Sequence, residues 1–393
     1  MRILFNIIFS AILVIGLVGF WALFLNLWKP KKKWPAWVGY IIISGAWFAA
    51  IRYYILNQVD LYGTMYYPLM NMFRTESYGF LFGVFLAIPV FIILSLLYWT
   101  INKIWSKTPE ENRTGRRAFF RTAATIVPLA TIGGSSYAAF AGQQELVVTH
   151  ESFGYTNLPP GLKNYKIVQL SDIHIGPSID LDDFDEILKL ALLQKPNRVV
   201  ITGDLIDKLA WLPQVCERLT TFAKQIPDGV DFILGNHEYH HDVNKVLDAL
   251  KRNTPMNILV NSNIQIMGGK QPVYIAGVAY DNDRKKDNRE AMINKALSGI
   301  PDYAFVILLA HHPEFFEESI ERKIPLTLSG HTHGGQIVFM GMPLVPTGTP
   351  YTKGRYVEEQ SVCYVNNGTG HWFPIRINCP REITVITFFD GVA

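Results

Sequence analysis

Residues 166–176 read KIVQLSDIHIG, and residues 198–207 read RVVITGDLID. In each stretch a short, mostly apolar run ends directly in Asp or His residues. Runs of this length and composition are typical of buried β-strands. Further runs of the same kind occupy residues 230–234, 273–278, 305–309 and 326–328, and helical patterns at 182–193 and 243–250 separate some of them. This alternation predicts an α/β domain.

Polar side chains follow the predicted strands at the point where each strand ends. Ligands of open α/β sheets gather at the carboxyl ends of the strands. The pairs Asp172/His174 and His331/His333 are spaced i, i+2, so both members of a pair face one way in extended backbone. The residues at these strand ends are Asp172, His174, Asp204, Asp207, Asn236, His237, His311, His331 and His333.

The chemical types in this set indicate a metal site. Asp, His and Asn offer oxygen and imidazole nitrogen without thiolate, a combination that suits Mn, Fe or Zn. Even seven ligands drawn from this set exceed what one tetrahedral zinc ion needs. They fit two divalent ions that share a carboxylate, an arrangement that activates water and holds a phosphoryl group.

The first 142 residues have a different composition. Residues 1–144 carry a net charge of +9 and the rest of the chain carries −6, so the overall +3 does not imply a nucleic-acid partner. Apolar runs at 3–28, 34–56, 80–101 and 118–142 predict four transmembrane helices, with buried helices of a soluble protein as the alternative. Three cysteines without CxxC spacing exclude a zinc ribbon or a dense disulfide scaffold.

The basic loops predict an orientation for these spans. Residues 29–33 and 103–117 are rich in Lys and Arg and should face the cytoplasm. Both termini and the α/β domain would then be extracytoplasmic, in a multi-pass protein of a bacterial inner or cell membrane. The stretch 115–121 (GRRAFFR) resembles a twin-arginine signal, which would make the twin-arginine export machinery a partner, but an ordinary basic flank explains it equally well.

The ordered set Asp-x-His, Gly-Asp-x-x-Asp, Gly-Asn-His-Glu, His and Gly-His-x-His resembles the calcineurin-like metallophosphoesterases. Segments 158–176, 329–337 and 374–383 resemble the membrane-anchored bacterial branch of that family. The resemblance implies a four-layer α/β/β/α sandwich of two mixed sheets. The expected organisation is a bundle of four transmembrane helices over 1–142, a short linker and lead-in strand over 143–165, and a metallophosphoesterase domain over 166–393.

The resemblance also implies a role for each residue of the set. One ion would be held by Asp172, His174, Asp204 and His333. The second would be held by Asp204, Asn236, His311 and His331, with Asp204 bridging. His237 would face the phosphoryl group, and Asp207 would orient His237.

Other residues carry open alternatives. Only one of the adjacent His311 and His312 can be the ligand, and the family pattern favours His311. The loop 366–372 (NNGTGHW) departs from the usual family run, so a substrate contact from His371 is uncertain. Tyr239 lines the substrate pocket or lies on the surface, and Arg376 contacts substrate or braces the C-terminal strands. Cys363 and Cys379 form a disulfide only if the domain is exported.

The function expected from these features is a membrane-anchored, metal-dependent phosphohydrolase. Its substrate would be a phosphodiester or pyrophosphate of a lipid or envelope component, cleaved outside the cytoplasm beside the lipid bilayer. The alternatives are a phosphomonoesterase and an envelope protein that binds metal without turnover. A transporter is disfavoured because the central parts of the four spans lack Asp and Glu.

Overall fold

The structure is a computed structural model of the 393-residue chain. It describes Val18, Trp37, Val38 and residues 60–104, 110–176, 178–280, 285–344, 346–372 and 375–391. The chain forms two compact units, Met1–Ala141 and Gly142–Ala393.

The described part of the first unit consists of two long helices, α3 (Tyr67–Ile104) and α4 (Glu110–Gln144). They approach each other closely at Gly83, where an added Cβ would come within 2.5 Å of the Ile132 Cα. Two turns earlier on α3, the Ser136 hydroxyl donates to Glu76 Oε1 at 2.9 Å. A small residue and a polar contact therefore hold this helix pair together.

The prediction of a four-span transmembrane bundle is wrong for the described residues. Among them, no helix combines the length with the unbroken apolar character that crossing a bilayer requires. Helix α3 carries Arg74 and Glu76 and has Pro89 in its interior, and the first half of α4 is rich in Glu and Arg. The predicted multi-pass membrane location is contradicted by the same finding. The predicted spans at 3–28 and 34–56 lie outside the described residues, apart from Val18, Trp37 and Val38.

The stretch 115–121 lies within α4. Its reading as a twin-arginine signal stays a prediction.

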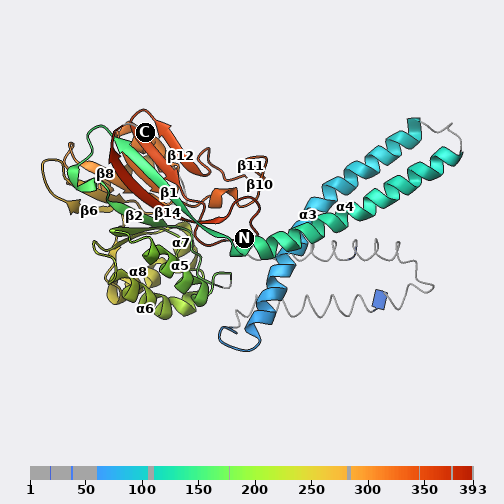
Figure 1. The fold of residues 1–393 in the computed structure, drawn as a ribbon, viewed down its shortest axis with the longest axis horizontal. Helices are drawn as coiled ribbons and strands as arrows, with labels where there is room; N and C mark the ends of the chain where they lie inside the picture. The colour runs from blue at the N-terminus through green and yellow to red at the C-terminus, as the bar shows by residue number, and fades with distance from the viewer. Residues whose placement is uncertain are drawn as a thin grey trace. The chain divides into compact units, whose positions relative to one another are not determined.

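The second unit contains two six-stranded mixed sheets (Figure 1). The first sheet has the order β1-β14-β2-β3-β4-β5. Its strands are β1 (Leu146–Tyr155), β2 (Lys166–Leu170), β3 (Arg198–Thr202), β4 (Val230–Ile233), β5 (Asn257–Ile258) and β14 (Arg381–Asp390). Strands β2 to β5 are parallel, and β14 runs antiparallel to β2 and parallel to β1.

The second sheet has the order β12-β13-β9-β8-β7-β6. Its strands are β6 (Ser262–Met267), β7 (Val273–Gly277), β8 (Phe305–Leu309), β9 (Leu326–Ser329), β12 (Gly354–Glu358) and β13 (Ser361–Val365). Strands β7, β8, β9 and β13 are parallel, and the edge strands β6 and β12 are antiparallel to their neighbours. A separate two-stranded hairpin is formed by β10 (Val338–Phe339) and β11 (Met342–Pro343).

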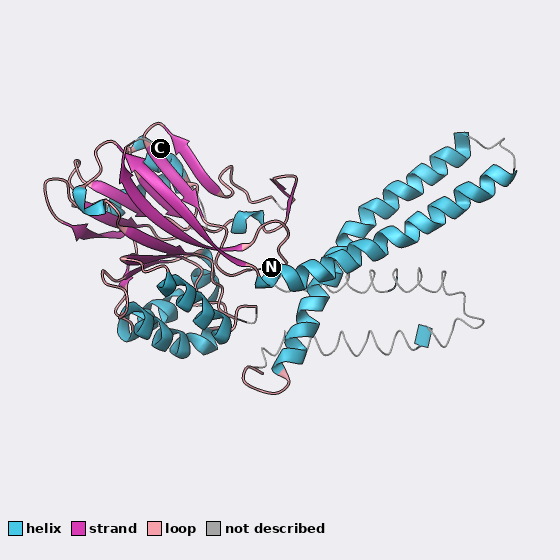
Figure 2. Ribbon diagram, viewed as in Figure 1, coloured by secondary structure: helices cyan, strands magenta, loops and turns pink. Residues whose placement is uncertain are grey.

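Apolar side chains fill the spaces between the layers. Side chains of both sheets, including Ile167, Val200, Ile275 and Ile307, form the core between them. Alternate residues of β7 and β8 pack instead on α9 (Lys286–Ala296) and α10 (Phe315–Glu321). On the first sheet, the covering helices are α5 (Leu181–Leu193), α6 (Leu212–Ala223) and α8 (Val243–Asn253), shown in Figure 2. The prediction of an α/β sandwich with two mixed sheets is confirmed.

Local sequence features account for strand β3 and for the start of helix α5. All five residues of β3 are buried, as a parallel strand covered on both faces requires. Helix α5 starts at a capping box, in which the Asp180 side chain accepts from the Asp183 N–H and the Asp183 side chain accepts from the Asp180 N–H.

Candidate metal centre

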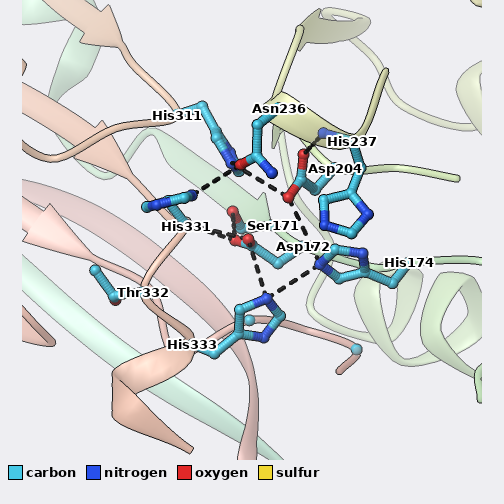
Figure 3. A network of polar contacts seen from close by, with 12 residues as sticks. Ser171, Asp172, His174, Asp204, Asn236, His237, His311, His331, Thr332 and His333 are labelled. Atoms are coloured by element: carbon cyan, nitrogen blue, oxygen red, sulfur yellow. Dashed lines mark hydrogen bonds and ion pairs between the residues drawn. The ribbon is translucent and has the colours of Figure 1, made fainter. Parts of the chain in front are cut away.

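The polar residues at the strand ends converge on one site (Figure 3). Strands β2, β3 and β4 end level with one another, since Leu170 pairs with Ile201 and Ile201 with Phe232. The Gln169 side chain joins the two sheets by donating to the Ser329 carbonyl at 3.0 Å. Asp172 and His174 follow β2, Asp204 and Asp207 follow β3, Asn236 and His237 begin α7 (Asn236–His241), His311 follows β8, and His331 and His333 follow β9.

One half of the site surrounds the carboxylate of Asp172. His333 Nε2 lies 3.4 Å from Asp172 Oδ1 and 3.1 Å from His174 Nε2. Both carboxylate oxygens of Asp172 also accept from the His331 N–H, and Oδ2 accepts from the Ser171 hydroxyl at 2.5 Å. Asp172, His174 and His333 each present one donor atom, and these atoms lie within 4.8 Å of one another.

The other half surrounds Asp204 and Asn236. His311 Nε2 lies 3.3 Å from Asp204 Oδ2, and His174 Nε2 lies 3.6 Å from the same oxygen. Asn236 Oδ1 lies 3.1 Å from His311 Nε2 and 2.9 Å from His331 Nδ1. Asp204 therefore stands between the two halves, as the predicted bridging role requires.

Several lone pairs in this site face one another, an arrangement that favours a bound cation. His311 Nδ1 donates to the Thr202 carbonyl at 2.8 Å, so a neutral His311 turns its Nε2 lone pair toward the oxygens of Asp204 and Asn236. Burial disfavours the imidazolium, but the charges of Asp204 and Asp172 outweigh burial and raise the pKa of His311 to about 10. A proton or a metal ion satisfies this cluster, and the donor set of Asp, His and Asn fits divalent ions.

Backbone conformation supports the same reading. Asp172, His174, Asp204, His331 and His333 all have φ between 50° and 69°. Non-glycine residues rarely adopt this left-handed region, and such strain clusters at functional sites. Between the two sheets, a Cβ on Gly330 would fall 1.9 Å from Ser171 Oγ, so the residue before His331 has no room for a side chain.

Glu238 is a site residue that sequence analysis left without a role. Its buried carboxylate accepts from three backbone N–H groups, those of Asp204 at 3.0 Å, Leu205 at 2.7 Å and Gly235 at 2.7 Å. It thereby ties the β3 loop to the start of α7. Its place in the Gly-Asn-His-Glu stretch was the signal that could have found it.

Asp207 contacts two imidazoles of the site. Its Oδ1 lies 2.6 Å from His237 Nδ1 and 3.3 Å from His174 Nδ1. Burial would lower the pKa of His237, but the hydrogen bond with Asp207 and the nearby carboxylates outweigh burial and raise this pKa to about 9. His237 is partly exposed and its ring centroid lies 4.4 Å from that of His174, so this imidazole stands at the edge of the ligand cluster.

The three predicted substrate contacts lie in different surroundings. Tyr239 is half-buried, with its ring centroid 5.7 Å from that of Tyr280. His371 is buried. Arg376 is also buried, and its guanidinium donates to the carbonyls of Asn367, Gly370 and Cys379 at 2.7–3.1 Å. The arrangement of Arg376 corresponds to the bracing alternative, and all three assignments as substrate contacts stay predictions.

His312 and the cysteines complete the neighbourhood. His312 packs against His331, with ring centroids 3.6 Å apart and ring planes inclined by 35°, while its neighbour His311 points to the carboxylates. Cys363 and Cys379 are free, buried thiols in the structure. The conditional disulfide between them is therefore not formed here.

Known proteins share this pattern of residues. The family model described as calcineurin-like phosphoesterase matches residues 165–335. An uncharacterised metallophosphoesterase of Campylobacter jejuni is 36% identical over 58% of this chain and 60% of its own length. One of Bacillus subtilis is 30% identical over 65% of this chain and 90% of its own length. A transmembrane protein with metallophosphoesterase domain from Danio rerio is 26% identical over 98% of this chain and 89% of its own length.

These similarities identify the family of the chain, but they do not identify a branch within that family. The chain spans about 60% of the length of the first curated relatives that it matches. Relatives from bacteria and from an animal both match, so the predicted membrane-anchored bacterial branch is not confirmed. The matched region contains every predicted metal ligand. The chain belongs to the calcineurin-like metallophosphoesterases, a family of metal-dependent phosphohydrolases.

Proposed function

We propose that this chain hydrolyses a phosphoester bond with the help of two divalent metal ions. The observation that carries the proposal is the position of His237. It is held by Asp207 at the edge of a complete set of seven ligand-type side chains. A site that only binds metal does not need such a residue.

The two halves of the cluster indicate how the ions would be shared. Asp172, His174, Asp204 and His333 would hold one ion, and Asp204, Asn236, His311 and His331 the other. When bound, the two ions supply Lewis acidity that activates water and neutralises phosphoryl charge. Asp207 orients His174 through Nδ1, and Thr202 orients His311 in the same way, so that both Nε2 atoms point inward.

His237 would supply the proton. With Nδ1 engaged by the Asp207 carboxylate, which favours the protonated ring, Nε2 can carry the second N–H. This N–H can donate to a phosphoryl oxygen or to the leaving alkoxide. An alkoxide is a poor leaving group, and a positioned acid is the usual way to assist its departure.

The proposed substrate class is a phosphodiester or pyrophosphate of a lipid or envelope component. A phosphomonoester is the alternative. The same ligand set and His237 can act on phosphodiesters and on phosphomonoesters, so an assay distinguishes the two classes.

The purified full chain should therefore be stripped of metal, reloaded with Mn, Fe or Zn and assayed on matched substrates. Suitable ones are bis(4-nitrophenyl) phosphate, 4-nitrophenyl phosphate and a nucleoside diphosphate sugar. Metal-dependent release of product from at least one of them is expected. Stoichiometric metal binding without hydrolysis of any of them would favour the non-catalytic alternative.

A further inference from the structure

An apolar hairpin follows directly on the metal-ligand loop. Strands β10 and β11 pair over only two residues each, and Figure 1 shows them as a separate hairpin. Four of its side chains are exposed, namely Phe339 (60%), Met340 (83%), Met342 (66%) and Leu344 (52%). From 334 to 352 the sequence has no charged residue. Exposed apolar side chains gathered in this way usually mark a binding surface.

The hairpin is anchored at its base and not merely a mobile loop. The Leu344 N–H donates to the Ile337 carbonyl at 2.8 Å, and Asn378 Nδ2 donates to the Val338 carbonyl at 3.1 Å. Ile337 in turn forms a β-bridge with Ile377. The apolar side chains therefore stand on a fixed support.

The position of the hairpin links it to the metal centre. Its first strand begins five residues after His333, and Met340 follows His333 by seven residues. At about 3.3–3.6 Å per residue, Met340 lies no more than roughly 25 Å from that ligand. A second loop also places an exposed apolar side chain near the predicted metal ligands. Trp372 is 59% exposed, and it follows Gly370 by two residues. The Gly370 N–H donates to the Asp172 carbonyl at 3.0 Å.

The shape and charge of the hairpin favour a lipid surface as its partner. A stable protein interface needs about 800 Å² from each partner, and a hairpin paired over two residues offers a narrow tip in place of a broad face. Apolar side chains on a narrow support can instead enter the headgroup–acyl boundary of a leaflet. The uncharged stretch ends in Lys353. A cation that follows the hairpin in the sequence suits anionic headgroups.

We infer that the β10–β11 hairpin inserts into the surface of a lipid leaflet and presents an acylated phosphoester to the metal centre. The inference rests on the proposed function and names the substrate class more closely. Insertion is a peripheral contact made by the second unit, so it requires no helix that crosses the bilayer.

Insertion is tested first without any assay of activity. The full chain with Met340→Cys carries an exposed thiol, while the native cysteines are buried, so a nitrobenzoxadiazole label reports on the hairpin. Leu193→Cys is the matched control, since Leu193 is 62% exposed at the end of α5. Vesicles of phosphatidylcholine and phosphatidylglycerol should shift the emission of the label at 340 to shorter wavelength and leave the label at 193 unchanged.

Three results would overturn the insertion. The first is an unshifted label at 340, and the second is an equal shift at both positions. The third is an emission at 340 that is already shifted without vesicles. In that last case, dependence on protein concentration would assign the hairpin to a second copy of the chain, and independence would assign it to another part of the same chain.

Activity then tests the consequence for substrate choice. Phe339→Ser and Met340→Ser should lower the rate on a phosphodiester carrying two acyl chains in vesicles, relative to the rate on bis(4-nitrophenyl) phosphate. Loss of the apolar area of one such side chain should reduce this ratio by about tenfold. Leu193→Ser should leave the ratio unchanged.

An unchanged ratio in the hairpin variants would contradict the inference and leave the phosphoesterase function standing. Wild-type protein that cleaves neither compound would contradict the proposed function, while the label at 340 would still decide the insertion.

Discussion

The backbone N–H of Asp204 donates to Oε2 of Glu238 at 3.0 Å, so the predicted bridging ligand is held in place by a buried carboxylate 34 residues away. The same carboxylate accepts from the N–H groups of Leu205 and Gly235. Three donors on two oxygens leave no place for an amide NH2 group. The strained, positive φ of Asp204 is maintained by this contact.

Glu238→Gln should therefore destabilise the site although it preserves shape. One backbone N–H would face the amide NH2 group, at a cost of about 1–3 kcal/mol for a buried unsatisfied donor. We expect a lower melting temperature and weaker binding of the second metal ion. Glu290→Gln, a change at a partly exposed position on α9, is the matched control. A Glu238→Gln protein with unchanged melting temperature and metal content would contradict this account.

The bridging role of Asp204 predicts an asymmetry between ligand variants. Asp204→Asn removes the charge that both halves of the site share, so metal content should fall from about two ions per chain to one or fewer. His333→Ala should empty mainly one position and leave about one ion. Elemental analysis of the purified chains measures this. Two ions retained in Asp204→Asn would remove the bridge from the mechanism.

His237 and Asp207 should separate catalysis from metal binding. His237→Ala removes the proton donor and should lower kcat by about 10²–10⁴-fold, with metal content nearly intact. Asp207→Asn should cause a smaller loss, because Asn can still contact the ring but no longer stabilises its positive charge. Steady-state kinetics and metal analysis on the same preparations are required. Loss of metal from His237→Ala would reassign His237 as a ligand.

Arg376 allows the bracing role to be told apart from substrate contact. Its guanidinium donates to the Cys379 carbonyl through Nη1 and to the carbonyls of Asn367 and Gly370 through Nη2, and the single ammonium nitrogen of Lys cannot occupy both positions. Arg376→Lys should lower the melting temperature and kcat together. A rise in KM with an unchanged melting temperature would instead indicate direct contact with substrate.

The capping box of α5 gives a pH-dependent prediction far from the site. Burial, followed by the negative charge of Asp180, raises the pKa of Asp183 to about 6. The folded state thus binds this proton more tightly than the unfolded state. The resulting stabilisation is present below about pH 4 and is lost as the pH rises through about 6.

Asp183→Asn should consequently be more stable than the wild type at pH 8, by about 1 kcal/mol after allowance for solvent screening, and its advantage should shrink toward pH 4. The Asn oxygen can still accept from the Asp180 N–H, which preserves the cap. Melting temperatures at several pH values measure the difference. Asp182→Asn, an exposed neighbour, is the control, and a pH-independent difference would contradict the prediction.

Much of the second unit was predictable from local sequence. The buried strands β2, β3 and β8 have the predicted bounds, because short apolar runs followed by polar residues mark buried parallel strands clearly. Strand β10 is much shorter and covers only Val338–Phe339. Apolar content alone does not distinguish a buried strand from an exposed hairpin.

The sequence by itself determined the chemical types of the site residues and their order along the strand ends. It could do so because ligand chemistry depends on residue type, and each polar cluster directly follows a recognisable apolar run. Its apolar runs did not determine a transmembrane bundle. The run 80–101 makes up only part of α3, which also carries Arg74 and Glu76 ahead of that run.

Only the tertiary structure decided which atoms face one another. The roles of Glu238 and Asp207 depend on contacts across 30 to 34 residues, between loops that the parallel strands bring to one edge. The bracing contacts of Arg376 and the anchored hairpin after His333 likewise arise from backbone groups distant in sequence. Such contacts depend on the packing of two sheets against each other, and no local pattern encodes that packing.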